Sequence, residues 1–137
     1  EGFYRVGPRQ MKPDSQYHLA FNLGYPNRFD RANGRTGSYL MVHGNCVSIG
    51  CYAMTDSNIE EIYLLAEAAL NAGQEQFDVH IFPFLMTDET LDRYSDSQWY
   101  PFWKNLQQGY RYFEERRQLP VIDVVDKQYL IKSSEQT

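Results

Sequence analysis

The sequence has few cysteines, few basic residues and no long apolar run, and each shortage excludes a class of protein. Two cysteines in 137 residues cannot form a disulfide framework, and by themselves they do not fix the redox compartment. Thirteen lysines and arginines against eighteen aspartates and glutamates give a net charge of −5, which argues against nucleic-acid binding because phosphates need a clustered basic face. No apolar run reaches the roughly eighteen residues of a membrane-spanning helix. We therefore expect neither a nucleic-acid partner nor a membrane span in this chain.

The sequence does contain enough apolar residues for a folded core. Hydrophobic residues make up 42% of the chain and aromatic residues 15%, which excludes a disordered or fibrous protein. A length of 137 residues is typical of one domain, and we expect residues 1–137 to form a single one.

Alternating apolar residues predict several strands. They are expected at Phe3–Val6, Tyr17–Tyr25, Tyr39–His43 and Phe77–Phe84, with a terminal hairpin or bent strand at Pro120–Val125 and Gln128–Ile131. His18 falls on the more polar face of its strand, where it is expected to be exposed or hydrogen-bonded. His80 lies inside its strand and is expected to be a core histidine. A polar tail, Lys132–Thr137, follows.

Apolar residues at three- and four-residue spacings predict helices. They are expected at about 57–72, at Thr87–Tyr94 and from Ser97 to about Arg117. The first should begin with a capping box formed by Ser57 and Glu60, and Gly73 should end it.

The segment from Pro26 to Ser38 has the composition of a loop, with Pro, Asn, Asp and Gly at close intervals. It carries Arg28, Arg31 and Arg35 and leads directly into the strand that ends at His43. A guanidinium group can bind a carboxylate through two hydrogen bonds. These arginines are therefore candidates for binding a substrate carboxylate, although they could also be ordinary solvated charges.

The stretch Met41–Asp56 holds both cysteines, a histidine, a serine and two glycines. A cysteine becomes a nucleophile when a neighbour favours its thiolate, and an imidazole at an adjoining strand end is a usual partner. The seven residues between His43 and Cys51 suffice for a turn that returns the sulfur to the imidazole. Gly50 would let the backbone turn sharply before the cysteine.

Acyl transfer is the reaction class that this pattern favours. Cys51 would attack an amide carbonyl, His43 would remove and later return the proton, and backbone N–H groups near Ser48–Cys51 would hold the oxyanion. Ser48 could help to place the tetrahedral intermediate, or it could simply bond its own loop backbone.

Two other interpretations of the same residues remain open. His43, Cys46, Cys51 and His80 offer the N and S ligands that zinc prefers, although no second close pair of ligands occurs elsewhere. Alternatively, Cys46 and Cys51 are structural, either as small buried residues or as a local disulfide that would silence the nucleophile. For Cys46 alone, burial is the favoured expectation.

The motif also resembles that of a known family. His43-Gly44 followed by Ser48-Ile49-Gly50-Cys51 resembles the His-Gly … Ser-x-Gly-Cys signature of the YkuD-type L,D-transpeptidase catalytic domain, and the full string of residues 43–56 looks like its YafK-like branch. Glu1-Gly2-Phe3-Tyr4 resembles a segment that precedes the site in this family. The similarity spans most of residues 1–86.

The resemblance implies an α+β domain with a mostly β catalytic sheet and flanking helices. It implies Cys51 as nucleophile, His43 as general base, and Ser48 and Gly50 in the turn that presents the thiol. Gly44 and Tyr52, beside them, are further candidate substrate contacts, and no cofactor or metal is implied. Strands precede Glu1-Gly2 in the family, so the first part of the domain is expected to be absent from this chain.

The implied substrates are peptidoglycan stem peptides in the periplasm. The YafK-like branch is similar to enzymes that hydrolyse the amide between diaminopimelate and the lysine of the murein lipoprotein. Hydrolysis is therefore expected, with transpeptidation or a non-catalytic peptidoglycan-binding module as alternatives. Ile49 stands where many members have a second histidine, and Tyr52-Ala53 replaces the usual Ile/Val-Arg, so no role of those groups carries over.

Overall fold

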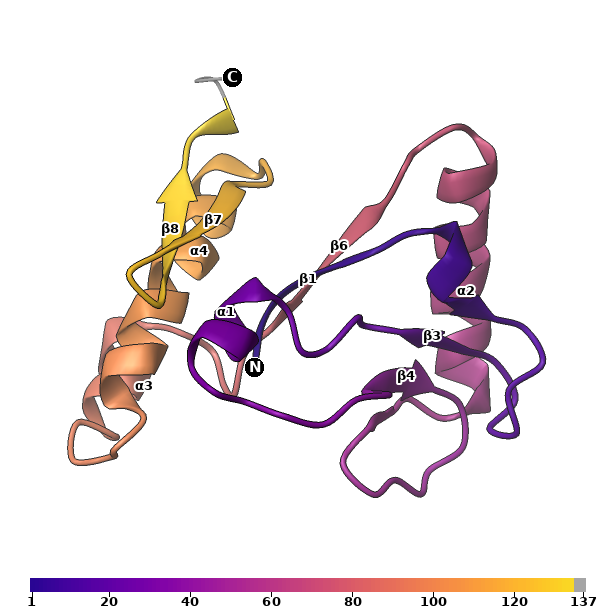
Figure 1. The fold of residues 1–137 in the computed structure, drawn as a ribbon, viewed down its shortest axis with the longest axis horizontal. Coiled ribbons are helices and arrows are strands. Elements are labelled where there is room, and N and C mark those ends of the chain that lie inside the picture. Colours follow the sequence, from indigo (N-terminus) through magenta and orange to yellow (C-terminus); the bar gives the residue numbers. More distant parts are fainter. Residues whose placement is uncertain (135–137) are drawn as a thin grey trace. The chain divides into compact units, whose positions relative to one another are not determined.

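The computed structural model describes residues 1–134, which divide into two compact units coloured along the chain in Figure 1. The N-terminal unit comprises residues 3–79, and the C-terminal unit comprises residues 1–2 and the chain from residue 80 onward. The described residues contain four α-helices, a short 3₁₀ helix and three small sheets. The mixed class is thus confirmed, but the α-helices hold more residues than the strands, and the expected mostly β composition is wrong. The single-domain organisation stays a prediction.

The part of the chain from Gly2 to Ile81 contains two of the sheets. In one, β1 (Gly2–Val6) pairs with β6 (Phe77–Ile81), and the 3₁₀ helix (Pro8–Gln10) follows β1. The other sheet has the order β2 (Met11–Lys12), β3 (Ala20–Asn22), β4 (Met41–His43) and β5 (Tyr52–Ala53). The first three of these strands are antiparallel, whereas β4 and β5 are parallel. The parallel pair brings the two ends of the predicted motif together.

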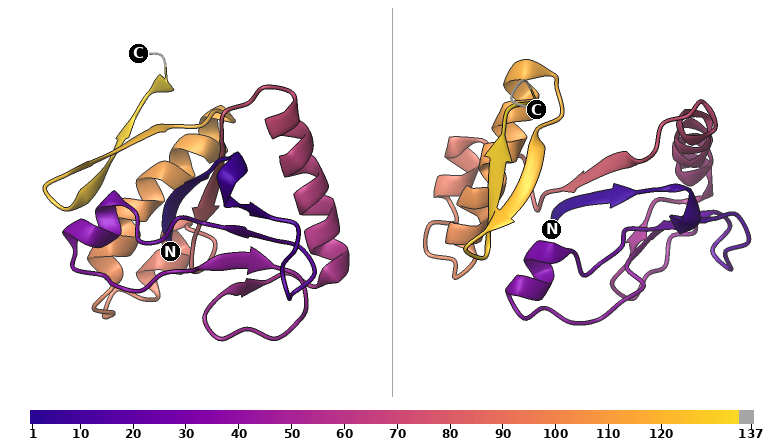
Figure 2. Two further views of the ribbon diagram at one scale, coloured as in Figure 1. Left: turned by 45° about the vertical axis from the view of Figure 1, so that its right-hand side comes forward. Right: turned by 45° about the horizontal axis from the view of Figure 1, so that its top comes forward.

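Helix α2 (Asp56–Asn71) lies beside β3 and β4 in Figure 2. It buries Ile59, Tyr63 and Ala66, which recur at the helical period, so the predicted amphipathic helix is confirmed. Its N-cap is Thr55, whose side chain makes no capping hydrogen bond, and the predicted capping box at Ser57 is wrong. Gly73, with a φ of +99°, follows the helix as predicted.

The predicted strands are mostly too long. Strand β3 begins at Ala20 and β4 at Met41, because His18 and Tyr39 have φ values of 72° and 56°, which a strand cannot accommodate. Strand β6 ends at Ile81, before Pro83. His80 is half-buried rather than a core residue, and its ring contacts Phe82.

The predicted loop at 26–38 contains a helix that local composition conceals. Helix α1 (Arg28–Ala32) begins with a reciprocal capping box, in which Asn27 Oδ1 accepts from Asp30 N at 2.9 Å and Asp30 Oδ2 accepts from Asn27 N at 3.0 Å. These two bonds satisfy N–H groups that otherwise lack partners at a helix start. Five helical residues therefore form in a stretch whose residue types favour turns.

The C-terminal unit holds α3 (Asp88–Asp92), α4 (Tyr100–Arg116) and a hairpin of β7 (Val121–Val125) and β8 (Gln128–Lys132). Both helices and the hairpin were predicted. Thr87 is the N-cap of α3, and α4 begins at Tyr100 with Trp99 as its N-cap, three residues later than the predicted start at Ser97. Asn105 on α4 exchanges two 2.8 Å hydrogen bonds with the backbone of Tyr129, which attaches β8 to the helix.

The hairpin turn and its continuation complete this unit. Asp126 and Lys127 both have positive φ, 50° and 63°, as a two-residue hairpin turn requires. Lys132, where a polar tail was predicted to start, is the last residue of β8, and Glu135–Thr137 of that tail lie outside the described residues. Within residues 1–134, no helix has the length and apolar character needed to cross a membrane.

Candidate active site

His43 is buried at the end of β4, with only 3% of its surface exposed. Its Nδ1 is in hydrogen-bond contact with the carbonyl oxygen of Gly44. A carbonyl oxygen can only accept, so Nδ1 carries the proton in this contact and Nε2 presents its lone pair. The backbone next to the histidine therefore fixes the tautomer that a general base needs.

Cys51 precedes β5 and is half-buried. Strand β5 runs parallel to β4, with Val42 opposite Tyr52 and His43 opposite Ala53. Cys51 itself lies outside the strand, one residue before Tyr52.

The thiol of Cys51 contacts the carbonyl oxygen of Tyr39, with Sγ 3.5 Å from the oxygen. Among the described residues, no hydrogen bond joins Cys51 to His43. The structure thus brings the predicted nucleophile and base to neighbouring strand ends without placing them in direct contact. Hydrogen bonds between catalytic groups are often long before substrate binds.

The connection from β4 to β5 and α2, residues 45–55, is here called the cysteine loop. Its two ends are joined, because Thr55 N donates to Asn45 O at 2.8 Å and Met54 N donates to His43 O at 2.8 Å. Asp56 adds a further contact by accepting from Asn45 N at 2.7 Å. The loop is therefore closed at its base while its tip projects.

The tip of the cysteine loop is exposed. Val47 is 64% exposed and Ile49 is fully exposed. Ser48 donates its hydroxyl to the carbonyl oxygen of Cys51 at 2.6 Å, which is the loop-backbone role considered for it. Gly50 has a φ of +93° with open space around it, as predicted for a sharp turn before the cysteine. Ser48 and Gly50 thus shape the turn that carries the thiol.

Gly44 is required by packing rather than by backbone conformation. A Cβ atom at this position would lie 2.6 Å from Tyr17 O, 2.7 Å from Asp56 Oδ1 and 3.0 Å from Ile59 Cγ2. Gly44 is buried, and Gly44 N donates to Leu19 O at 3.0 Å. This close packing gives the glycine a structural role, while its predicted substrate contact stays a prediction. Tyr52 is half-buried in β5, and its predicted substrate contact also stays a prediction.

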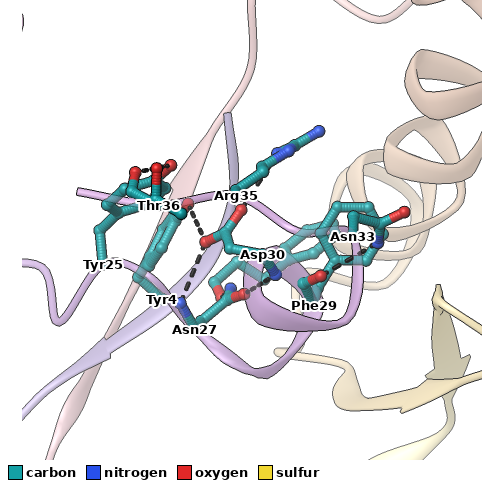
Figure 3. Close-up of polar contacts among 9 residues, drawn as sticks. Tyr4, Tyr25, Asn27, Phe29, Asp30, Asn33, Arg35 and Thr36 are labelled. Atoms are coloured by element: carbon teal, nitrogen blue, oxygen red, sulfur yellow. Dashed lines mark hydrogen bonds and ion pairs between the residues drawn. The ribbon is translucent and has the colours of Figure 1, made fainter. Parts of the chain in front are cut away.

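One arginine of the 26–38 segment, Arg35, contacts a buried carboxylate, as Figure 3 shows. Asp30 is completely buried and accepts hydrogen bonds from Tyr4 Oη at 3.0 Å, Asn27 N at 3.0 Å and Arg35 Nη1 at 3.0 Å. We call these four residues the Asp30 cluster. The Arg35 guanidinium also lies over the Phe29 ring, 5.1 Å from its centroid. A buried carboxylate with these partners is fully compensated.

The three candidate arginines therefore have different surroundings. Arg35 neutralises Asp30, which makes it a structural residue. Arg31 is exposed and its guanidinium contacts the carbonyl oxygen of Pro26, and Arg28 is exposed at the start of α1. The predicted substrate contacts of Arg28, Arg31 and Arg35 stay predictions.

The alternative interpretations of the cysteines receive little support from the structure. Cys46 is exposed, so its expected burial is wrong, and both cysteines are free thiols rather than a disulfide. Across residues 1–134, no three His, Cys, Asp or Glu side chains are grouped as metal ligands would be, so the zinc site considered for His43, Cys46, Cys51 and His80 is not formed.

Two residues of the site were not identified from the sequence. Tyr17 contacts His43, with 4.8 Å between ring centroids and 37° between ring planes. Asp56 closes the base of the cysteine loop. The Thr-Asp pair before α2 was a visible signal for Asp56, because such residues gather at helix starts. No sequence signal indicates Tyr17, since its contact depends on the backbone turn at His18.

Comparison with known proteins gives two closely similar relatives. Both are from Escherichia coli, one from strain K12 and one from O157:H7, and both bear the name "Putative L,D-transpeptidase YafK". Each is 50% identical to this chain over 131 residues, which are 96% of this chain and 53% of the relative. The chain thus spans about half the length of the curated relatives it matches. No protein-family model matches it. The resemblance to the YafK-like branch predicted from the motif is confirmed by this identity.

Proposed function

Because this is a YafK-like L,D-transpeptidase chain over nearly its whole length, we propose that it forms part of a cysteine acyl-enzyme acting on peptidoglycan stem peptides. The observation that carries the proposal is the geometry at the ends of β4 and β5. There, the carbonyl oxygen of Gly44 bonds Nδ1 of His43, and Cys51 immediately precedes β5, which pairs with β4. A thiol beside a base of fixed tautomer is the minimal set for acyl transfer.

The proposed reaction begins with a proton transfer. Rotation about the Cα–Cβ bond of Cys51 moves its sulfur away from the Tyr39 carbonyl, and His43 Nε2 takes the thiol proton. The thiolate attacks the amide carbon, and backbone N–H groups of the turn before Cys51 stabilise the oxyanion. The protonated imidazole then gives its proton to the leaving amine, which produces a thioester on Cys51.

The acyl acceptor decides the second half of the reaction. If water attacks the thioester, the products are a free carboxylate and free Cys51, and the enzyme is a hydrolase; if an amine attacks, a new amide forms. We propose hydrolysis of the amide between diaminopimelate and the lysine of the murein lipoprotein, in the periplasm. The support is the YafK-like motif of residues 43–56 and the 50% identity to YafK.

The test is an assay on lipoprotein-linked muropeptides, with products identified by mass. We expect the wild-type protein to release the muropeptide, and Cys51→Ala to lower turnover by about 10³-fold or more while leaving the thermal unfolding midpoint unchanged. Cys46→Ala is the matched control, because it removes an exposed thiol five residues away on the same loop. It should keep full activity.

The other outcomes separate the alternatives. If new crosslinked species form, the reaction at this site is transpeptidation rather than hydrolysis. Ligand that is retained but unchanged would identify a non-catalytic binding module. Loss of activity in Cys46→Ala with retention in Cys51→Ala would overturn the assignment of the nucleophile.

A further inference from the structure

The ring of Tyr17 contacts the general base proposed above. Its centroid lies 4.8 Å from that of the His43 imidazole, and the two planes are inclined by 37°. His43 is 3% exposed, whereas Tyr17, whose ring contacts the imidazole, is 47% exposed. The Tyr17 hydroxyl has no hydrogen-bond partner within residues 1–134. Tyr17 therefore interacts with the site through its ring and not through its hydroxyl.

The backbone around Tyr17 is attached to the same elements that hold the site. Gly44 N donates to Leu19 O at 3.0 Å, and the space where a Gly44 side chain would project is filled by Tyr17 O. His18 has a φ of 72°, which reverses the chain between Tyr17 and β3. Its Nε2 lies 2.7 Å from Glu60 Oε1 on α2. The backbone on either side of Tyr17 is thus held from both β4 and α2.

The contact with the Tyr17 ring restricts a tilt of the His43 imidazole that its hydrogen bond leaves free. The bond from Nδ1 to Gly44 O holds one nitrogen, but the imidazole can still tilt about its χ2 bond, whose rotamer distribution is broad. An aromatic ring packed on one face limits that tilt. The electron-rich face of the phenol also favours the imidazolium formed when His43 accepts the thiol proton.

We propose that Tyr17 is a positioning residue that holds the His43 imidazole at the angle from which Nε2 takes the proton of Cys51. The inference rests on the proposed function, because it concerns the base of that reaction. Tyr17 acts through His43, and it is not assigned any contact with the substrate. The hydroxyl is not needed for this role.

Three variants of Tyr17 test the proposal in the muropeptide assay. Tyr17→Ala should lower kcat by roughly 10- to 100-fold with little change in KM, because a misplaced catalytic group slows the chemical step. Tyr17→Phe keeps the ring and should retain wild-type kcat. Tyr17→Leu keeps apolar bulk without an aromatic face and should be intermediate; it also replaces the alanine variant if that one does not fold. Alkylation of Cys51 by iodoacetamide should slow in parallel with kcat, which gives a readout that needs no substrate.

The matched control is Tyr94→Ala in the C-terminal unit, since Tyr94 is 46% exposed. It should leave both rates unchanged. The NMR resonance of the His43 ring proton on Cε1 should move in Tyr17→Ala and stay in place in Tyr17→Phe, because a neighbouring ring current causes the difference. A purely structural role for Tyr17 would lower the unfolding midpoint without this pattern.

Several results would overturn the inference. These are a kcat of Tyr17→Ala equal to that of Tyr94→Ala, an equal loss in Tyr17→Phe and Tyr17→Ala, or a change in KM alone. If Cys51→Ala or His43→Ala keeps activity, the proposed function itself is wrong. If both lose activity and Tyr17→Ala does not, only the role of Tyr17 is wrong.

Discussion

The Asp30 cluster and the cysteine loop lie in the same unit and are both rich in polar groups, but they use those groups in opposite ways. In the Asp30 cluster the carboxylate is completely buried and accepts bonds from Tyr4, Asn27 and Arg35. In the cysteine loop the closing hydrogen bonds gather at the base, and the tip is exposed. In the Asp30 cluster the polar side chains stabilise the fold. In the cysteine loop, hydrogen bonds at the base hold the segment that carries Cys51.

The difference shows how charged residues near a motif should be interpreted. Arg35 looked like a candidate for a substrate carboxylate, but the protein supplies that carboxylate itself in Asp30. Arg35 pairs with a completely buried carboxylate five residues earlier, so it has a structural role whether or not it also binds a ligand. Substitutions in the two regions should therefore differ in kind: those in the cluster lower stability, and those in the loop lower activity.

The largest effect is expected from Asp30→Ala. Removing the carboxylate leaves the Arg35 guanidinium and the Tyr4 hydroxyl without their buried partner, which should cost about 3 to 5 kcal/mol of unfolding free energy. Urea unfolding measures it. The control is Asp56→Ala in the other region, where an exposed carboxylate accepts one backbone bond and its loss should cost about 1 kcal/mol. Equal losses would remove the distinction between the regions.

The next effect concerns two glycines of the site. Gly44→Ala should lower the unfolding free energy by about 2 to 3 kcal/mol, because its Cβ would lie 2.6 Å from a backbone oxygen. Gly50→Ala should cost only about 1 kcal/mol, since space is open and only the left-handed backbone is strained. Thermal unfolding compares the two. A larger loss at Gly50 would mean that the turn before Cys51 is more tightly built than the structure shows.

The arginines give a smaller and more selective effect. Arg35→Met should lower the unfolding free energy by about 1 to 2 kcal/mol, because Asp30 keeps its other two bonds. Arg31→Met should change it by less than about 0.5 kcal/mol, since that guanidinium is exposed. Urea unfolding and the KM for muropeptides are measured for both variants. A raised KM in Arg31→Met alone would assign substrate binding to α1, and an unchanged KM in both would end that prediction.

The smallest effect tests whether a carboxylate that has hydrogen-bonded partners but is not buried contributes to stability. Asp88 in the C-terminal unit bonds Arg111 and Gln107 but is largely exposed, and the bond from Arg111 lowers the pKa of its carboxyl below 3.8. A lowered folded pKa stabilises the protein above the unfolded value, and this contribution disappears as pH falls through the folded pKa. The stability difference between wild type and Asp88→Asn should therefore be small at pH 7 and vanish with acidification below pH 3.8. A difference as large as that of Asp30→Ala would show that exposure does not matter.

Elements with a strong period and a clear end were predictable from the sequence. Helices α2 and α4 and the terminal hairpin follow from helical spacing and from the turn at Asp126-Lys127. The strands were overextended, because alternation continues past the point where positive φ at His18 or Tyr39 ends the pairing. Local patterns carry no information about those dihedral angles.

The site was predictable only in part, for a related reason. The spacing of His43 and Cys51 predicted a turn between them, and in the structure His43 ends β4 while Cys51 precedes the parallel strand β5. Helix α1 was missed because its capping box lies among residues that favour turns. The ion pair of Arg35 could not be predicted because it depends on the burial of Asp30, which the local sequence does not show. The contact of Tyr17 with the imidazole joins residues 26 positions apart and leaves no local trace.

Because the cysteine loop is closed at its base, its tip can accept insertions without disturbing the strands and helix on either side. Because Thr55 and Asn45 bond to each other across its ends, β4 and α2 keep their positions whatever chain runs between them. Doubling the length of such a connection costs only about 0.6 kcal/mol in closure entropy. Insertions near Val47 and Ser48 would thus alter how the thiol is presented, and with it the acyl acceptor that reaches it, without endangering the fold. Lengthening this one loop would therefore be a way to change which acceptor takes the acyl group.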